Sequence, residues 1–259
     1  MSRHMQIAII GAGNMGGAIA DALLQQGTYT IAVSNPTPSK LQRFVQQGAH
    51  VTTDNCEAAR QADIVVLAVK PWLVESVLAE LSGQVALTHK TVISVAAGIT
   101  GQQLCQWAGP EVTLFSVIPN TAIARRQSVT LIVPVRATAE ATDAVCRLFE
   151  PMGMTFVTDE AHLAAATALT SCGIAYALRY VRAATEGAVE LGMKPAEAQR
   201  LVAQTLRGAA ALLEPEGTHA ETEIDRVTTP GGLTIRGLNA MEQAGFTAAV
   251  IAGLKASTL

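Results

Sequence analysis

A short apolar segment followed by a glycine motif limits the fold of this chain more than any other feature. The β-branched run Gln6–Ile10 is typical of a strand buried on both faces. A G-x-G-x-x-G motif follows at once, and a helical pattern continues from Gly17 to Gln26. In such a turn the first glycine permits the tight bend, the second lets backbone approach a pyrophosphate, and the third lets helix and strand pack closely. The motif predicts a dinucleotide site formed by Gly11, Gly13, Asn14, Met15 and Gly16.

Further apolar segments alternate with helical patterns up to about Asp159, and only helical patterns follow. This alternation predicts βα units that form a mostly parallel, doubly wound sheet. We therefore expect an α/β Rossmann domain over residues 1–159 and an all-α domain over residues 160–259. The predicted strands after the first are Thr30–Ser34, a short one near His50–Thr52, Asp63–Val69, Thr91–Ala96, Val112–Ile118, Val129–Val133 and Met154–Val157.

The end of the second predicted strand should lie beside the adenosine ribose of the cofactor. NAD-selective domains usually place a carboxylate there, whereas this chain has Ser34 and Asn35, with Lys40 and Arg43 further along. Because no acid repels a 2′-phosphate, we expect NADPH as the cofactor, with NADH possible. Asn55 follows the next short strand, where it lies against the adenosine or caps a helix.

Ligands of open parallel sheets bind beyond the carboxyl ends of the strands. Three segments at such ends are candidates for the wall of the nicotinamide site: Ala68-Val69-Lys70-Pro71, Ala96-Ala97-Gly98 and Pro119-Asn120. Lys70 is either a catalytic amine or a residue whose backbone contacts the cofactor. The second interpretation is favoured, because Pro71 fixes the chain and the flanking residues are small.

Composition excludes several other classes of function. A net charge of −3 and a pI near 6.0 give no reason to expect nucleic acid or an anionic membrane surface as partner. No apolar run reaches the roughly 18 residues of a membrane span. The cysteines are widely spaced and the histidines isolated, which favours thiols in a reducing cytoplasm over disulfides or a metal site.

The helical half is rich in alanine between Ala161 and Ala188. Its apolar positions outnumber one core-facing stripe, so a small all-α domain cannot bury them alone. We therefore expect at least a homodimer formed through this domain.

A turn rich in hydroxyl, proline and glycine residues, Val227 to Thr234, separates two helical patterns. Paired glycines leave backbone N–H groups unshielded, and a turn that opens a helix can hold an anion. The alternative is a plain interhelical turn. His219 lies a few residues earlier and either lines this site or, as is more common, caps or packs.

Several segments together resemble the pyrroline-5-carboxylate reductase family. They are Gly11–Ala18, Leu67–Pro71, Ser94–Ile99, Ile118–Thr121, Ser171–Tyr176 and Val227–Gly237, in the family's order. The resemblance implies a Rossmann domain and a helical domain that forms an intertwined dimer, sometimes assembled further. It also implies reduction of the cyclic imine 1-pyrroline-5-carboxylate to L-proline by NADPH or NADH.

On this resemblance, the turn binds the substrate and Asn120 lies near it. We expect the substrate carboxylate to receive hydrogen bonds from Val227, Thr228, Thr229, Gly231 and Gly232, and Thr234 Oγ1 to contact the ring nitrogen as the catalytic residue. The chain departs from the family at Thr229 (usually serine), Ile174 (usually proline), Ser116 (usually arginine) and Ala122–Gln127 (usually proline and a glycine-rich turn). These departures leave a related cyclic imine as an alternative substrate.

Two rival functions share the dinucleotide fold. A β-hydroxyacid dehydrogenase needs a lysine early in the long helix to transfer a proton, and residues Thr170–Gly187 contain none. A non-catalytic NADP sensor would not need the hydroxyl groups of Thr229 and Thr234.

Overall fold

The computed structural model describes residues 4–215 and 217–258, and the chain divides into two compact units, Met1–Ser171 and Cys172–Leu259. Helix α7 (Glu160–Thr167) begins at the boundary expected from the sequence. It packs against strand β7 (Ser128–Arg136), so the chain stays with the first unit until Ser171. The outer limits of the two expected domains, residues 1 and 259, lie outside the described residues.

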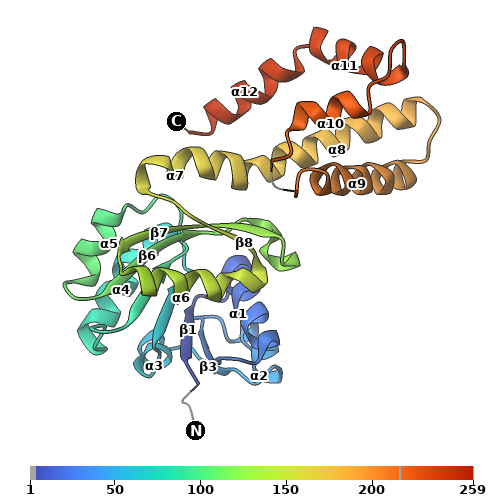
Figure 1. The fold of residues 1–259 in the computed structure, drawn as a ribbon. Coiled ribbons are helices and arrows are strands. Elements are labelled where there is room, and N and C mark those ends of the chain that lie inside the picture. The colour runs from blue at the N-terminus through green and yellow to red at the C-terminus, as the bar shows by residue number, and fades with distance from the viewer. Residues whose placement is uncertain (1–3, 216, 259) are drawn as a thin grey trace. The chain divides into compact units, whose positions relative to one another are not determined.

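The first unit is built on one eight-stranded sheet in the order β3-β2-β1-β4-β5-β6-β7-β8 (Figure 1). Neighbouring strands are parallel except β6 and β7, which are antiparallel, so the expected mostly parallel sheet is confirmed. The other strands are β1 (Gln6–Ile10), β2 (Thr30–Ser34), β3 (His50–Thr52), β4 (Ile64–Leu67), β5 (Thr91–Ser94), β6 (Thr113–Ile118) and β8 (Gly153–Val157).

Helices cover both faces of this sheet, as a doubly wound fold requires. One apolar cluster joins the sheet to α1 (Asn14–Gln26), α2 (Gln42–Gln46) and α6 (Ala139–Phe149). A second cluster joins the opposite face to α3 (Asn55–Arg60), α4 (Val74–Gln84) and α5 (Gly101–Ala108). Short 3₁₀ turns occur at η1 (Pro38–Lys40), η2 (Pro71–Leu73), η3 (Thr121–Arg125) and η4 (Glu150–Met152).

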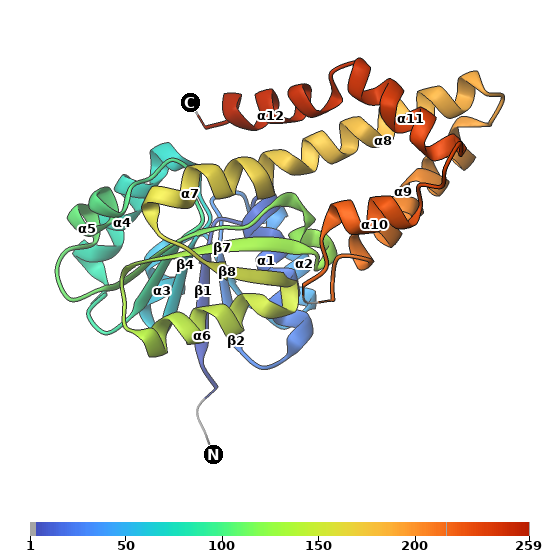
Figure 2. The ribbon, with the colours of Figure 1, turned by 45° about the horizontal axis from the view of Figure 1, so that its top comes forward.

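The second unit contains only helices among its described residues. They are α8 (Gly173–Glu190), α9 (Pro195–Ala211), α10 (Ala220–Arg226), α11 (Leu233–Gln243) and α12 (Phe246–Ala256), and α8 packs against α9 (Figure 2). A helical pattern runs through residues 231–254 of the sequence, and the structure divides it into two helices. Gly245 adopts the left-handed conformation, with φ 82°, and separates α11 from α12.

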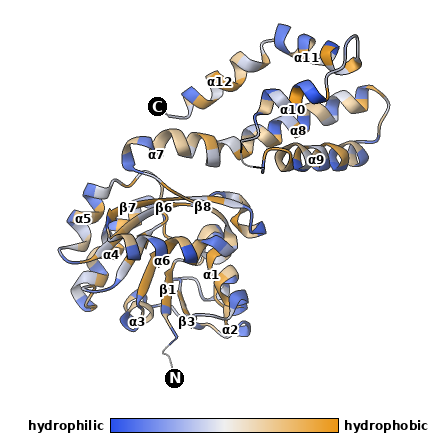
Figure 3. Cartoon of the chain, viewed as in Figure 1, coloured by the Kyte–Doolittle hydropathy of each residue, from blue (hydrophilic) through white to orange (hydrophobic). Residues whose placement is uncertain are grey.

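Apolar side chains of the second unit lie largely at its surface in the single chain. Ala198 is the one buried residue among those described in this unit. Figure 3 shows apolar stretches along α8, α9 and α12. Large exposed side chains include Leu178, Tyr180, Leu191, Leu201, Leu233, Phe246, Val250 and Ile251.

Helices α7 and α8 join through a π-helical turn, η5 (Ala168–Cys172), into one stretch from Glu160 to Glu190. Among the described helices, this stretch alone meets the length and composition of a membrane span, with an 18-residue window of mean hydropathy 1.3. Polar residues such as His162, Thr170 and Ser171 interrupt the apolar ones in this stretch, which is why no single apolar run of that length stands out in the sequence.

Candidate functional site

The glycine turn after β1 has the geometry that its motif predicts. Gly11 has a φ of 102°, and a Cβ atom there would lie 2.7 Å from the carbonyl oxygen of Ala68. A Cβ at Gly16 would collide with the carbonyl oxygen of Gly11, because helix α1 packs tightly on the turn. A Cβ at Gly13 would meet no atom within 4 Å. The turn therefore has no space for a side chain at Gly11 or Gly16, whereas the space beside Gly13 is open, as a phosphate there would require.

The start of helix α1 is free to receive an anion. Its N-cap residue is Gly13, and no side chain caps the helix. The unshielded N–H groups and the helix dipole favour a phosphate at this point. The residues present therefore fit the pyrophosphate of a dinucleotide.

Ser34 and Asn35, at the end of β2, brace the glycine turn. Asn35 Oδ1 accepts a hydrogen bond from the Ala12 N–H at 3.1 Å, and the Ser34 carbonyl accepts one from the Gly11 N–H at 2.9 Å. Both Ser34 and Asn35 are buried. Both residues thereby hold the glycine turn in shape, and their direct contact with the cofactor stays a prediction.

The side-chain amide of Asn55 has hydrogen-bond partners at both of its ends. It accepts a hydrogen bond from Ser34 Oγ at 2.7 Å and donates one to Glu80 Oε2 at 3.0 Å. The residue that caps helix α3 is Asp54, so Asn55 is not the cap. Contact of Asn55 with the adenosine stays a prediction.

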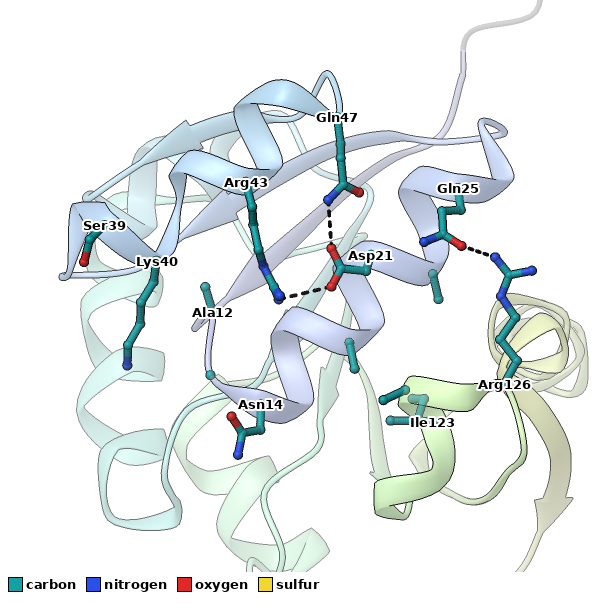
Figure 4. Close-up of a pocket in the computed structure, with 14 residues that line it drawn as sticks. Ala12, Asn14, Asp21, Gln25, Ser39, Lys40, Arg43, Gln47, Ile123 and Arg126 are labelled. Atoms are coloured by element: carbon teal, nitrogen blue, oxygen red, sulfur yellow. Dashed lines mark hydrogen bonds and ion pairs between the residues drawn. The ribbon is translucent and has the colours of Figure 1, made fainter. Parts of the chain in front are cut away.

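A groove of about 880 Å³ runs from the glycine turn along helix α1 (Figure 4). Ser39 and Lys40 of η1 line one side, and Arg126, which follows η3, lies at the far end. Since three cations and one acid line the groove, it suits an anionic ligand. Its lining residues are Ala12, Gly13, Asn14, Ala18, Asp21, Ala22, Gln25, Ser39, Lys40, Arg43, Gln47, Ile123, Ala124 and Arg126.

Arg43 lies flat against helix α1 inside this groove. Its Nη2 atom is 3.1 Å from Asp21 Oδ2, and Gln47 Nε2 donates to Asp21 Oδ1 at 3.0 Å. A Cβ at Gly17 would meet Arg43 Nη2, so the guanidinium would have to shift its position on its flexible side chain. Sequence reasoning missed Asp21, Gln47, Gln25 and Arg126, because only the packing of α1, α2 and η3 brings them together.

The candidate nicotinamide wall lies at the same edge of the sheet as the glycine turn, since β1, β4, β5 and β6 are adjacent and parallel. Lys70 is extended and exposed before Pro71, and Ala97 is exposed after β5. Ala68 and Val69 are half-buried. Contacts of these residues with the nicotinamide, and the backbone role of Lys70, stay predictions.

Asn120 follows β6 and has partners at both ends of its side-chain amide. Its Oδ1 accepts from the Ala122 N–H at 2.9 Å, and its Nδ2 donates to the carbonyl oxygen of Thr170 at 3.0 Å. Its backbone N–H donates to Ser128 Oγ at 3.1 Å. Contact between Asn120 and substrate stays a prediction.

In the second unit, the threonine-glycine turn leads directly into helix α11. Gly231 has a φ of 69°, and the Gly232 N–H donates to the Thr229 carbonyl oxygen at 3.0 Å. Gly232 is the N-cap of α11, with no side-chain cap. A Cβ at Gly232 would lie 2.5 Å from Thr229 Oγ1. The turn therefore folds Thr229 over an uncapped helix start, which is suited to a carboxylate.

The hydroxyl groups of this turn differ in their availability. Thr228 Oγ1 donates to the Ile224 carbonyl oxygen at 2.6 Å, so this hydroxyl is engaged with helix α10. Thr229 and Thr234 are exposed. His219 caps α10, accepting from the Glu221 N–H at 3.2 Å, as the non-catalytic interpretation expects.

One other cluster of potential ligand atoms occurs among the described residues. Asp54, Cys56 and Glu80 have ligand atoms within 4.8 Å of one another. Burial, and then Glu80 and Asp54, raise the pKa of the Cys56 thiol, which disfavours the thiolate that binds metals. Asp54 is also engaged as the cap of α3.

Comparison with known proteins agrees with both halves of this description. The family "Pyrroline-5-carboxylate reductase dimerisation" matches residues 160–259, and the family "NADP oxidoreductase coenzyme F420-dependent" matches residues 6–98. Pyrroline-5-carboxylate reductase 2 of Dictyostelium discoideum is 35% identical over 98% of this chain and 91% of its own length. Pyrroline-5-carboxylate reductase 3 of Rattus norvegicus is 32% identical over 100% of this chain and 95% of its own.

A solved pyrroline-5-carboxylate reductase from Coxiella burnetii has the same fold across both units. It superposes with a TM-score of 0.92 at 30% identity, covering 99% of this chain and 97% of its own. The likeness thus extends over the dinucleotide groove and the threonine-glycine turn alike. The chain belongs to the pyrroline-5-carboxylate reductase family.

Proposed function

We propose that this protein reduces 1-pyrroline-5-carboxylate to L-proline with NADPH. The observation that carries the proposal is the uncapped start of helix α11, where Thr229 and Thr234 stand exposed beside a glycine pair. In a member of this family that also has a dinucleotide groove, such a turn provides the carboxylate site that the substrate needs.

The chemistry explains why few catalytic side chains are required. A cyclic imine that enters protonated has an electrophilic carbon, and NADPH supplies the hydride. As the new C–H bond forms, the C=N π electrons move to nitrogen, which becomes a neutral amine without receiving a proton in that step. The protein must therefore position the ring, bind the carboxylate and hydrogen-bond the nitrogen.

The threonine-glycine turn is suited to these tasks. The backbone N–H groups at the start of α11 and the Thr229 hydroxyl would bind the carboxylate, and Val227, Thr228 and Gly231 would contribute backbone contacts. Thr234, in the first turn of α11, would present Oγ1 to the ring nitrogen. A donor aimed at a reacting centre commonly contributes a factor of about 10² or more to the rate.

The groove beside the glycine turn supports NADPH over NADH. Ser34 and Asn35 stand where NAD-selective domains carry an acid, and their side chains face inward. Ser39 and Lys40 line the groove close to Ala12 and Gly13. These residues leave a cationic environment for a 2′-phosphate.

We also propose a homodimer formed through the second unit, as the matching dimerisation family indicates for residues 160–259. Leu178 and Leu201 are 62% and 57% exposed on the packed helices α8 and α9, and a second copy would cover such side chains. The apolar stretch Glu160–Glu190 suits the same interface. The proposed location of this dimer is the cytoplasm.

The decisive experiment follows the loss of NADPH absorbance in the presence of pyrroline-5-carboxylate, with proline measured as product. The wild-type protein should turn over, and Thr234→Ala should lower kcat/KM by about 10² while leaving the Kd for NADPH unchanged. The matched control is Thr205→Ala, since the Thr205 hydroxyl bonds only to the Leu201 carbonyl in its own helix.

The same assay separates the alternatives. Turnover of a β-hydroxyacid with NADP⁺ in place of imine reduction would favour a dehydrogenase. Tight NADPH binding without turnover of any imine would favour a sensor. Near-full kcat/KM in Thr234→Ala would remove Thr234 from the proposed mechanism.

A further inference from the structure

A chain of buried polar groups crosses the otherwise apolar end of the sheet in the first unit. Thr130 Oγ1 donates to Ser128 Oγ at 3.1 Å, and Ser128 Oγ accepts from the Asn120 N–H at the same distance. Asn120 Nδ2 then donates to the Thr170 carbonyl oxygen. Thr130, Ser128 and Asn120 are between 0% and 4% exposed. Buried polar groups are costly unless fully paired, so each hydrogen bond of this network helps to fix the position of the groups that it joins.

The network ends at the carbonyl oxygen of Thr170, which belongs to the π-helical turn η5 (Ala168–Cys172). A π-turn inserts one residue into an α-helix, and this rotates the following residues by about 100° around the helix axis. Such turns are less stable than α-helix and persist where other groups hold them. Asn120 supplies such a group, since its amide occupies the Thr170 carbonyl oxygen from outside the helix.

A second observation shows that this turn is under constraint. Ser171 Oγ is buried and has no hydrogen-bond partner among the described residues, and Thr170 Oγ1 bonds back to the Ala166 carbonyl oxygen at 2.8 Å. A relaxed α-helical turn would offer Ser171 a backbone carbonyl one turn earlier. The π-turn therefore contains a buried polar atom without a partner, next to the Thr170 carbonyl that Asn120 holds.

We propose that Asn120 is a positioning residue, which acts on the reaction through Thr170 by locking η5 in the π conformation. This inference rests on the proposed function. The chain leaves the first unit at Ser171 and continues directly into α8. The register of η5 therefore decides which residues of Gly173–Glu190 lie on each face of that helix, including Ile174.

Direct contact with substrate is the competing role for Asn120. The side chain is 4% exposed, and both ends of its amide are engaged, by Ala122 and by Thr170. A residue in that state transmits its effect through the groups it holds. These engagements favour the positioning role over direct contact with substrate.

Asn120→Asp separates the two bonds of the amide. The variant keeps Oδ1 as acceptor for the Ala122 N–H, so the cap of η3 survives. It replaces the donor to Thr170 with an oxygen. Ser128→Ala is a milder second variant, which removes the acceptor of the Asn120 N–H and leaves the amide itself intact.

The test combines amide hydrogen exchange over residues 168–172 with steady-state kinetics. In Asn120→Asp, we expect exchange in this segment to rise at least ten-fold and kcat/KM for pyrroline-5-carboxylate to fall about ten-fold or more, with the Kd for NADPH within two-fold of wild type. Ser128→Ala should show smaller changes in the same directions. Thr138→Ala, which loses the cap of α6, is the control for a general loss of stability.

Three outcomes would overturn the inference. The first is unchanged exchange at 168–172 in both variants, and the second is a kinetic loss no larger than that of Thr138→Ala. The third is a loss of NADPH binding in Ser128→Ala equal to the loss of turnover. If the wild-type protein fails to reduce the imine, the proposed function fails, and the exchange measurement still decides whether Asn120 locks the turn.

Discussion

The two units of this chain bury their apolar residues to very different extents. The sheet unit has Phe44, Phe115 and Phe149 fully buried, and helices shield both of its faces. The helical unit has only Ala198 buried among its described residues. The sheet closes its core within one chain, because crossover helices cover it. The helices leave their apolar faces open in the single chain, so we expect their stability to depend on a second surface that covers them.

The same contrast applies to function. The groove proposed for the dinucleotide lies within the sheet unit, where Asn35 braces the glycine turn and Lys40, Arg43 and Arg126 line the groove. The threonine-glycine turn presents hydroxyl groups at the surface of the helical unit. Variants of the sheet unit should therefore affect cofactor binding, and variants of the turn should affect turnover at constant cofactor affinity.

The largest effect is expected from Gly16→Ala. The new Cβ would collide with the carbonyl oxygen of Gly11, so α1 must move away from the glycine turn. We expect loss of NADPH binding and a lower Tm, measured by fluorescence titration and thermal unfolding. The control is Gly83→Ala in α4, where a Cβ meets no atom within 4 Å and helix propensity improves. Wild-type affinity in Gly16→Ala would show that this packing is not needed.

A smaller effect, confined to turnover, is expected from Gly232→Ala. Its Cβ would approach Thr229 Oγ1 to 2.5 Å, which displaces the hydroxyl from the start of α11. We expect kcat/KM for the imine to fall by about 10 to 10², with the Kd for NADPH unchanged. Gly237→Ala, one turn further along α11 with free space around it, should leave both constants near wild type. Equal losses in the two variants would separate the turn from catalysis.

Cofactor preference should respond to Lys40. In Lys40→Ala we expect kcat/KM for NADPH to fall about ten-fold, or about 1.4 kcal/mol, and the value for NADH to change little. The measured quantity is kcat/KM for NADPH divided by kcat/KM for NADH, and this ratio should fall. Arg147→Ala removes an exposed cation of α6, outside the groove, and should leave the ratio unchanged. A higher ratio in Lys40→Ala would contradict the placement of the 2′-phosphate.

The smallest effect concerns acid stability at the start of α7. The His162 N–H, and then the His162 ring, hold the pKa of the Asp159 carboxyl below its ordinary value. A depressed carboxyl pKa stabilises the folded state above the unfolded pKa, and this contribution is lost as pH falls through the folded pKa. The chemical shift of the His162 amide should titrate with a midpoint below the ordinary aspartate value. In Asp159→Asn, a cap that does not titrate, this acid transition should be absent.

Local patterns made much of the sheet unit predictable. The boundaries of β1 and β2 match the apolar runs, because a strand buried on both faces is a continuous apolar segment. Gly11 and Gly16 have the tight turn and the close helix packing that their spacing predicts, and the approach of a pyrophosphate to Gly13 stays a prediction. The separation of α11 from α12 at Gly245 could not be predicted in this way, since one glycine inside a long helical pattern does not reveal a left-handed conformation.

Side-chain pairings across the fold were not predictable. Arg43 and Asp21 come from different helices, and Asn120 and Thr170 are separated by 50 residues. No periodicity links such residues, because their contact depends on how elements pack. These pairings shape the groove and the π-turn, so the parts of the site that depend on tertiary packing required the structure.

We expect a second copy of the chain to cover the apolar side chains that the helical unit exposes. Light scattering of the purified protein at micromolar concentration, without detergent, tests this most directly. We expect a mass of at least twice 27.0 kDa, and Leu178→Asp, which places a charge on a 62% exposed apolar position of α8, should lower it. A stable wild-type monomer of 27.0 kDa that reduces pyrroline-5-carboxylate at full rate would contradict the account.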